Sequence, residues 1–166
     1  MNKIHLKKVK AQREILETSG IAHIVWREHY ANIISSDQIE YMLAQFQSPD
    51  AIGKAIAEGY EYYLLRRFGV SAGYIGIKPN EPQGKMFLSK IYLLKDYRGR
   101  GYAYDTVTQL VEMSRRLHFS SIWLTVNKEN PSVSAYKKMG FEIMEEIVTD
   151  IGHGYVMDDY VMEKQV

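Results

Sequence analysis

The chain has 166 residues, a formal net charge of +1 and no cysteine. This length is typical of one domain, so residues 1–166 are expected to form a single domain that buries about two-thirds of its unfolded surface. The small net charge gives no whole-surface attraction to nucleic acid or to a membrane, and the lack of cysteine excludes disulfides and thiolate chemistry. The N-terminus lacks a signal-peptide pattern, and no apolar run approaches the roughly 18 residues of a membrane span, which predicts a cytoplasmic protein.

The first half of the chain predicts a strand, several helices and a hairpin. The expected elements are a strand at 4–9, a helix at 12–30, a helix from Ser35 through Phe46, a short helix from Asp50 to Ile56, and strands at 61–68 and 72–78. We expect the first helix to be interrupted near Ser19 and Gly20. Ser35, with Gln38 three residues later, resembles a capping box at the start of the second helix.

A turn at residues 95–103 follows the apolar run 86–94, which is rich in strand formers. A helical pattern comes after the turn, carried by Ala103, Val107, Leu110, Val111, Ser114 and Leu117. The first turn of a helix has backbone N–H groups without intrahelical partners, and the helix dipole makes that end partly positive. Two glycines let a ligand approach the backbone closely, and two arginines add charged donors. Such a turn is suited to a phosphate or pyrophosphate.

Known phosphate-binding motifs can be compared with this turn. It lacks the Lys-Ser or Lys-Thr of a P-loop, and Tyr104 stands where a dinucleotide fingerprint needs its third glycine. The spacing Arg98-x-x-Gly101-x-Ala103 resembles the acetyl-CoA signature of the GNAT family of N-acetyltransferases, Gln/Arg-x-x-Gly-x-Gly/Ala. By itself the motif also fits an ordinary surface turn before a helix.

The second half of the chain carries a further part of the resemblance. A strand at 122–127, then Asn130, Tyr136 and Gly140-Phe141, follow the order and spacing of the family. Two more strands are expected at 141–151 and 155–164. The resemblance implies an α/β fold with a mixed, mostly antiparallel central sheet that is splayed at the acetyl-CoA site and has helices on both faces.

The resemblance also implies roles for particular residues, with acetyl-CoA as the co-substrate. The backbone of Ile91 and Leu93 would bind pantetheine, and the turn would bind the pyrophosphate through Arg98, Gly99, Arg100, Gly101, Tyr102 and Ala103. Tyr136 matches the tyrosine that protonates the leaving thiolate, and a core tyrosine is the alternative interpretation. Asn130 would orient CoA, cap the short helix, or do both. No metal ligand is expected.

The general base is not identified by the resemblance. Many relatives have a glutamate on the central strand where this chain has Ser89, followed by Lys90. Other candidates for the base are Glu28 and His29. Asp158 and Asp159 are also expected to be catalytic, and because side chains alternate along a strand, they should point to opposite faces of the sheet. Two further interpretations are charges that keep an edge strand soluble, and an ordered water as base.

Charge is uneven along the chain. Residues 78–100 hold six basic and two acidic residues, whereas residues 141–166 hold seven acidic residues and one lysine. The acidic segment favours a cationic acceptor such as a polyamine, although exposed strand charge explains the same count. The sequence also loosely resembles bacterial spermidine/spermine acetyltransferases.

We therefore expect an N-acetyltransferase that moves an acetyl group to a small primary amine by direct attack in a ternary complex. The alternative is a GNAT-like module that binds acyl-CoA as a sensor or scaffold without turnover. Neither nucleic acid nor membrane is an expected partner, and a homodimer is possible by analogy with the family.

Overall fold

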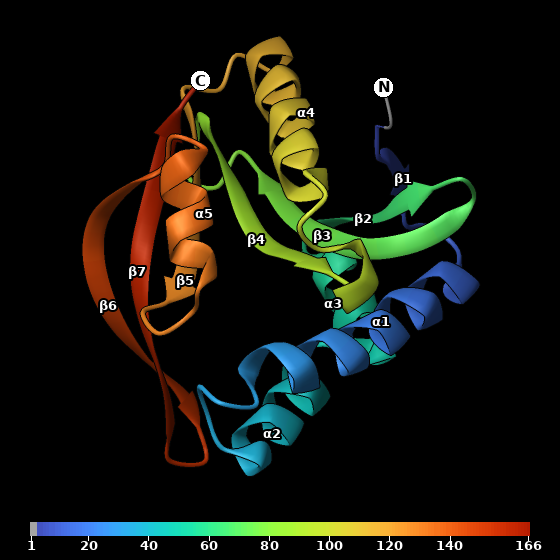
Figure 1. The fold of residues 1–166 in the computed structure, drawn as a ribbon, viewed down its shortest axis with the longest axis vertical. Coiled ribbons are helices and arrows are strands. Elements are labelled where there is room, and N and C mark those ends of the chain that lie inside the picture. The colour runs from blue at the N-terminus through green and yellow to red at the C-terminus, as the bar shows by residue number, and fades with distance from the viewer. Residues whose placement is uncertain (1–2) are drawn as a thin grey trace.

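One seven-stranded sheet runs through the protein, and the computed structural model describes residues 3–166 (Figure 1). The strands are β1 His5–Lys8, β2 Glu61–Arg67, β3 Val70–Pro79, β4 Lys85–Leu93, β5 Ser121–Asn127, β6 Glu142–Gly152 and β7 Tyr155–Gln165. The helices are α1 Gln12–Tyr30, α2 Ser36–Phe46, α3 Pro49–Ala57, α4 Tyr102–Arg116 and α5 Ser132–Lys138, with the 3-10 turn η1 Lys95–Tyr97 before α4. This order of elements is the one that the sequence predicts.

The strand order across the sheet is β1-β2-β3-β4-β5-β7-β6. Only β4 and β5 pair in parallel, and every other neighbouring pair is antiparallel. Parallel neighbours need a crossover connection, and α4 supplies it between β4 and β5. The mixed, mostly antiparallel sheet that the resemblance implies is confirmed.

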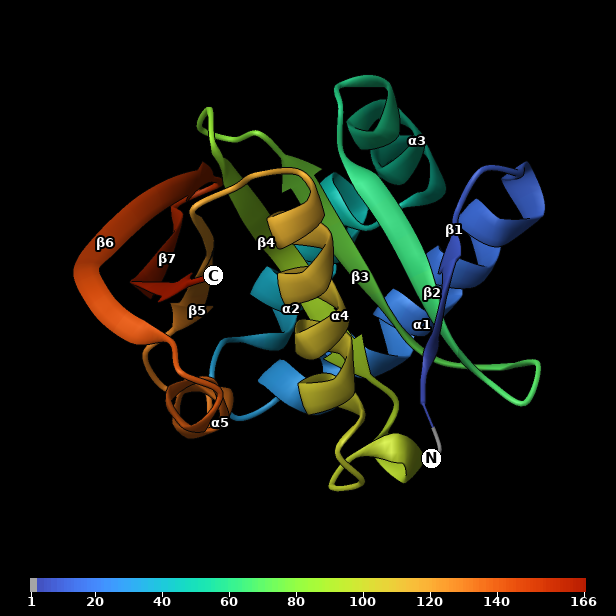
Figure 2. The ribbon, with the colours of Figure 1, turned by 90° about the horizontal axis from the view of Figure 1, so that it is seen from above.

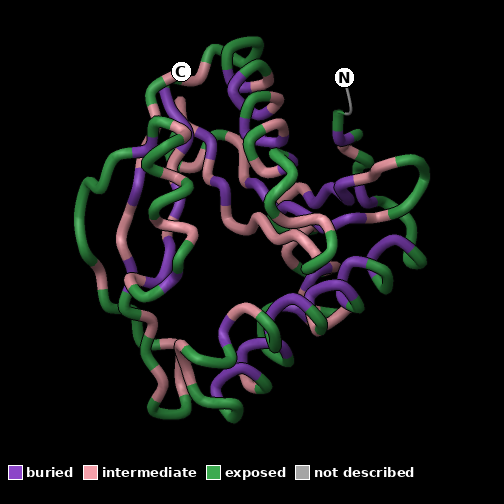
Figure 3. Tube along the Cα trace, viewed as in Figure 1, coloured by how far each residue is buried: buried purple, intermediate pink, exposed green. Residues whose placement is uncertain are grey.

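Helices cover both faces of the sheet (Figure 2). Successive side chains of a strand point to opposite faces, so Tyr62 and Leu64 of β2 pack with α1, α2 and α3, whereas Tyr63 and Leu65 pack with α4. The two faces therefore have separate apolar cores, while β6 at the sheet edge is largely exposed (Figure 3). None of the helices in residues 3–166 is long and apolar enough to cross a membrane.

The predicted interruption of the first helix is wrong, because α1 is continuous from Gln12 to Tyr30. The small polar residues there have partners that leave the helix intact: Thr18 Oγ1 donates to the Glu14 carbonyl, and Ser19 Oγ donates to the carbonyl of Gln47, the residue that follows α2. Ser19 thus ties α1 to the end of α2.

The predicted cap of α2 is confirmed in half of its contacts. Ser35 Oγ accepts the N–H of Gln38 at 3.1 Å. The Gln38 side chain does not return to the cap, because its Nε2 donates to the carbonyl of Val156 at 3.0 Å. Gln38 therefore ties α2 to β7.

The strands β4 and β5 separate soon after they pair. Their pairing is confined to Lys85–Phe87 of β4 and Ser121–Trp123 of β5. Gly76 of β3 is opposite Lys90, and Ile77 is opposite Leu88, so Ser89 is an extra residue in β4. Such a bulge bends its strand and increases the local twist. The bulge lies where the two strands part.

Candidate active site

Three adjacent cavities occupy the opening between β4 and β5. A groove of about 210 Å³ lies on the α4 and α5 side and is lined by Ile91, Leu93, Arg98, Gly99, Ala103 and Tyr136 among others. An inner pocket of about 300 Å³ lies on the α1 and α2 side, with Trp26, Gln47, Tyr60, Lys90, Tyr92 and Asp159 in its wall. A small cavity of about 30 Å³, here called the passage, lies between them and shares Tyr92 with the lining of both.

The floor of the groove is the unpaired edge of β4. The N–H of Leu94 donates to the Ala72 carbonyl of β3. Because hydrogen-bonding direction alternates along a strand, the backbone groups of Ile91 and Leu93 face the opposite edge, toward the opening. The predicted position of these two residues is therefore matched by the geometry, and the Leu93 carbonyl is already bonded to Arg98 Nε at 2.9 Å.

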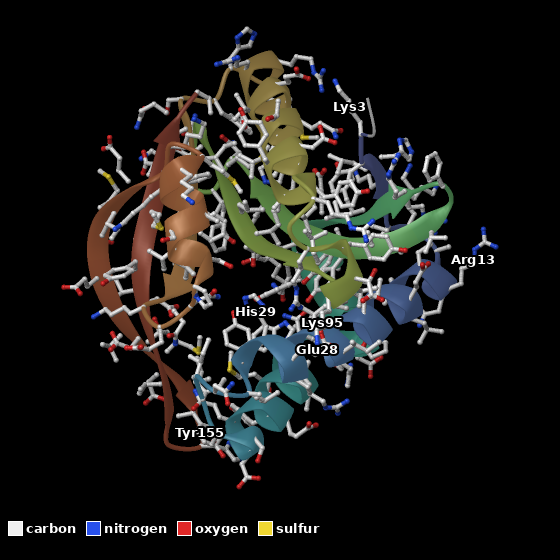
Figure 4. The ribbon with its side chains drawn as sticks, in the orientation of Figure 1. Lys3, Arg13, Glu28, His29, Lys95 and Tyr155 are labelled. Carbon is white, nitrogen blue, oxygen red and sulfur yellow. The ribbon has the colours of Figure 1, made fainter. Side chains whose placement is uncertain are left out.

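The turn before α4 forms one end of the groove. Gly99 and Gly101 have φ angles of 73° and 80°, a region that favours glycine, and Gly101 is the N-cap of α4 without a side-chain cap. The first N–H groups of α4 thus remain for a ligand. Arg98 lies beside them, held by Leu93 and by Glu28 of α1 at 3.5 Å. Figure 4 labels Glu28 and His29 at this end of α1.

Two residues of the turn contribute differently from the rest. Arg100 is exposed. The Tyr102 side chain is buried and its hydroxyl accepts a hydrogen bond from Arg67 Nε at 3.0 Å, so only the backbone of Tyr102 is directed at the groove end.

Tyr136 of α5 lines both the groove and the passage. It packs edge-on against Phe141, with ring centroids 5.8 Å apart. Burial raises the pKa of Tyr136, and the nearby Tyr30 raises it further. The phenol therefore keeps its proton at neutral pH and can donate it.

His29 and Asn130 lie at the same junction. His29 Nε2 is 3.2 Å from Asn130 Oδ1, and burial is the main cause that lowers the pKa of His29. Asn130 is buried, and its Oδ1 also accepts the N–H of Ser132 at the start of α5. The capping function expected for Asn130 is therefore observed, and its contact with a ligand remains a prediction.

The two aspartates of β7 are in different environments. Asp158 is exposed, forms an ion pair with Lys128 at 2.9 Å and does not line the inner pocket. Asp159 is 7% exposed, lines that pocket, and its Oδ1 has no hydrogen-bond partner in the described part of the chain. Burial, and then the charge of Asp158, raise the pKa of Asp159 to about 6. Of this pair, the structure brings only Asp159 to the site.

The inner pocket also contains residues that the sequence motifs did not reveal. Tyr30 and Tyr92 line both the pocket and the passage, with their hydroxyl oxygens 3.3 Å apart. Gln47 and the aromatic ring of Tyr60 complete one side. No local pattern identifies them, because they come from four separate segments of the chain and meet only in the folded protein.

A family model described as the acetyltransferase (GNAT) family matches residues 19–141, which is most of the chain. The chain belongs to the acetyltransferase (GNAT) family. It is accordingly an acetyl-CoA-dependent N-acetyltransferase, with acetyl-CoA as co-substrate. The groove fits that ligand, because it combines the unpaired β4 edge with the exposed N–H groups of α4 and the guanidinium of Arg98.

Solved structures share the fold at low sequence identity. The PaiA N-acetyltransferase of Thermoplasma acidophilum, in complex with coenzyme A, has a TM-score of 0.81 and 19% identity over 99% of each chain. A GCN5-related N-acetyltransferase of Rhodopseudomonas palustris has a TM-score of 0.83 and 16% identity, over 100% of this chain and 98% of the other. A chimera of the spermidine N-acetyltransferase SpeG from Vibrio cholerae has a TM-score of 0.71 and 15% identity over 98% and 95%. No curated protein sequence matches the chain.

Proposed function

We propose that this chain transfers the acetyl group of acetyl-CoA to a primary amine by direct attack in a ternary complex. The observation that supports the proposal is that the groove and the inner pocket approach the passage from opposite faces of the sheet and share lining residues with it. A thioester lying in the groove and an amine in the pocket can therefore meet at the passage. The chain has no cysteine to form an acyl-thioester of its own.

Asp159 is the residue that we assign to the amine. A primary amine enters the pocket mainly as an ammonium ion and must lose one proton before its nitrogen can attack. Asp159 holds the ammonium and takes that proton, and its raised pKa of about 6 brings it closer to the task than an ordinary aspartate. Ser89, at the bulge, cannot do this work, and Asp158 is outside the pocket.

Tyr136 is the residue that we assign to the leaving group. Attack of the amine nitrogen forms the N–C bond, and breaking the C–S bond leaves a CoA thiolate. The Tyr136 phenol protonates this sulfur, the second proton of the nitrogen restores the phenol, and the proton held by Asp159 is released to water. The ammonium ion and acetyl-CoA are thereby converted into an N-acetylamine, CoA with a free thiol, and one released proton.

A cationic acceptor is the finer part of the proposal, and a polyamine is one candidate. Aromatic rings of Trp26, Tyr30 and Tyr92 surround a pocket that contains the Asp159 carboxylate, an arrangement that attracts ammonium groups. The similarity in fold to the spermidine N-acetyltransferase SpeG is consistent with that candidate. The seven acidic residues of 141–166 add less support for a cationic acceptor, because two of them, Glu146 and Asp158, are paired with Lys128.

The second candidate is a module that binds acyl-CoA without turnover, and the serine at position 89 favours it. The two are separated by measuring CoA release from acetyl-CoA against a broad panel of amines, beside calorimetric binding of acetyl-CoA. Catalysed release with at least one amine supports the transferase. Tight binding of acetyl-CoA with no release across the panel supports the module.

A further inference from the structure

The inner pocket contains a second charged residue, Lys90 of β4. The Lys90 stem packs against Gly76 of β3, where its Cδ lies 3.6 Å from the position of an added Cβ. Its ammonium lies 5.7 Å and 5.5 Å from the ring centroids of Tyr60 and Tyr62. The Lys90 side chain thus extends over β3 and β2, away from β5 and from the β7 strand that carries Asp159.

The Lys90 ammonium is short of hydrogen-bond acceptors. Ser89 Oγ lies 2.9 Å from its Nζ, and no carboxylate within residues 3–166 forms an ion pair with it. Lysines nearby on the sheet differ in this respect, since Lys78 pairs with Glu81 at 3.0 Å and Lys85 pairs with Glu163 at 3.1 Å. Burial lowers the pKa of Lys90 to about 8, because no counter-ion offsets the loss of water.

Gln47 adds a second donor to the wall of the same pocket. It is 1% exposed, and its Oε1 accepts a hydrogen bond from the Tyr74 hydroxyl at 3.1 Å. This contact directs the amide so that Nε2 is the free end, and Nε2 has no acceptor among the described residues. A buried donor without an acceptor costs free energy, which a ligand oxygen can recover.

We infer that the acceptor amine also bears a carboxylate, and that Lys90 with Gln47 binds this carboxylate while Asp159 binds the amino end. The acceptor is then of the amino acid class, a primary amine and an acid in one small molecule. The inference rests on the proposed transferase function and narrows its substrate. A polyamine is disfavoured by the same geometry, because its distal ammonium groups meet the unpaired Lys90 ammonium.

The test compares each amino acid with its own carboxamide. The panel contains lysine, arginine, tyrosine and leucine, their C-terminal amides, and cadaverine and spermidine, assayed by CoA release with saturating acetyl-CoA. The amide keeps the shape and removes the negative charge. The amide also has a less basic α-amine, which loses its proton more readily at neutral pH, so amine protonation cannot make the amide the poorer substrate. We expect the best amino acid to exceed its amide by at least about tenfold in kcat/KM, the effect of one charge-assisted bond.

Substitutions at Lys90 then locate the effect. Lys90→Met keeps the stem and removes the charge, so KM for the best amino acid should rise by at least about tenfold while KM for its amide is unchanged. Lys90→Arg should restore part of the discrimination. Lys10→Met is the matched control, because Lys10 is an exposed lysine that lines neither the groove, the passage nor the inner pocket. It should leave both KM values unchanged.

Contrary outcomes are distinguishable. Amides, cadaverine or spermidine that equal or exceed the amino acids overturn the inference and leave the transferase function standing. No CoA release with any amine overturns the transferase function. The inference is then decided by calorimetric titration of the amino acids into the CoA-saturated protein: binding that Lys90→Met abolishes supports the carboxylate site, and absence of such binding overturns it.

Discussion

His29 of α1 and Asn130 at the start of α5 meet at the passage, with 3.2 Å between His29 Nε2 and Asn130 Oδ1. The two residues are 101 positions apart in the chain. Because Oδ1 also accepts the Ser132 N–H at 2.8 Å, a single amide oxygen joins the helix layer on one face of the sheet to a helix on the other. The position of Tyr136, one turn further along α5, depends on this connection.

Removal of the Asn130 amide should destabilise the protein. Asn130→Ala leaves the Ser132 N–H without its acceptor, and a lost cap of this kind costs about 1 kcal/mol of unfolding free energy. Asn130→Asp keeps the acceptor and, by placing a negative charge beside the imidazole, should raise the pKa of His29. Urea denaturation and NMR titration of the His29 ring measure the two effects. Equal stability of Asn130→Ala and the wild type would contradict the capping role.

Changes in the turn before α4 should weaken acetyl-CoA binding. Gly101 has room for a side chain and a φ of 80°, which asparagine and aspartate tolerate best among the other residues. Gly101→Asn is therefore a matched control for Gly101→Asp, and the two variants differ mainly by a negative charge at the phosphate site. Only the aspartate should reduce affinity strongly, and Arg98→Ala should cost about 1.5–3 kcal/mol of binding. Calorimetry that gives wild-type affinity for both Arg98→Ala and Gly101→Asp would disprove a phosphate site here.

Loss of the Tyr136 hydroxyl should slow the chemical step. Tyr136→Phe retains the ring that packs on Phe141, so the fold and the acetyl-CoA affinity should be preserved. Acid–base assistance contributes typically about 10²–10⁴-fold, and kcat should fall within that range. Steady-state kinetics with the best acceptor measure the change. A wild-type kcat would leave Tyr136 as a packing residue.

The pH dependence of activity should report Asp159. Its carboxyl must be ionised to accept the proton, so kcat/KM should fall as the pH drops through about 6. Asp159→Asn should lower kcat/KM and remove this inflection. Asp158→Asn is the matched control on the exposed side of β7 and should keep both the rate and the inflection. Identical profiles for the two variants would exclude Asp159 as the proton acceptor.

The contribution of Asp159 to the free energy of unfolding should fall as the pH rises, whereas its contribution to activity rises. Its pKa is raised from 3.8 to about 6 in the folded protein, so the ionised carboxylate destabilises the fold. This cost is absent below pH 4, grows between pH 4 and 6, and is complete above pH 6, where it amounts to about 3 kcal/mol at most. Asp159→Asn should therefore unfold at higher denaturant concentration than the wild type at pH 7.5, with the gain vanishing near pH 4. A variant that is less stable than the wild type at pH 7.5 would show that the carboxylate has a stabilising partner.

Local sequence was enough to predict the helices and strands and the turn at one end of the groove. The periodicity on either side of residues 95–103, with glycines at 99 and 101, was enough to predict a strand, a turn with exposed N–H groups and a helix, because these features depend on neighbours within a few positions. The roles expected for Asn130 and Tyr136 came instead from the resemblance of their spacing before Gly140-Phe141 to the GNAT family. Strand alternation also required that Asp158 and Asp159 point to opposite faces.

Only the tertiary structure decided which aspartate faces the pocket, because both faces of β7 carry apolar and polar side chains and the face of each depends on its register with β5. The bond between Ser19 and Gln47, 28 positions apart, is also a tertiary contact, and α1 is unbroken where it forms. Lys90 likewise follows Ser89 in the sequence as an ordinary strand lysine. The lowered pKa of Lys90 arises from its packing beside the rings of Tyr60 and Tyr62 and from the absence of a carboxylate partner within residues 3–166. Such unpaired charges depend on long-range packing, and desolvation acts on a side chain only when distant segments have closed around it.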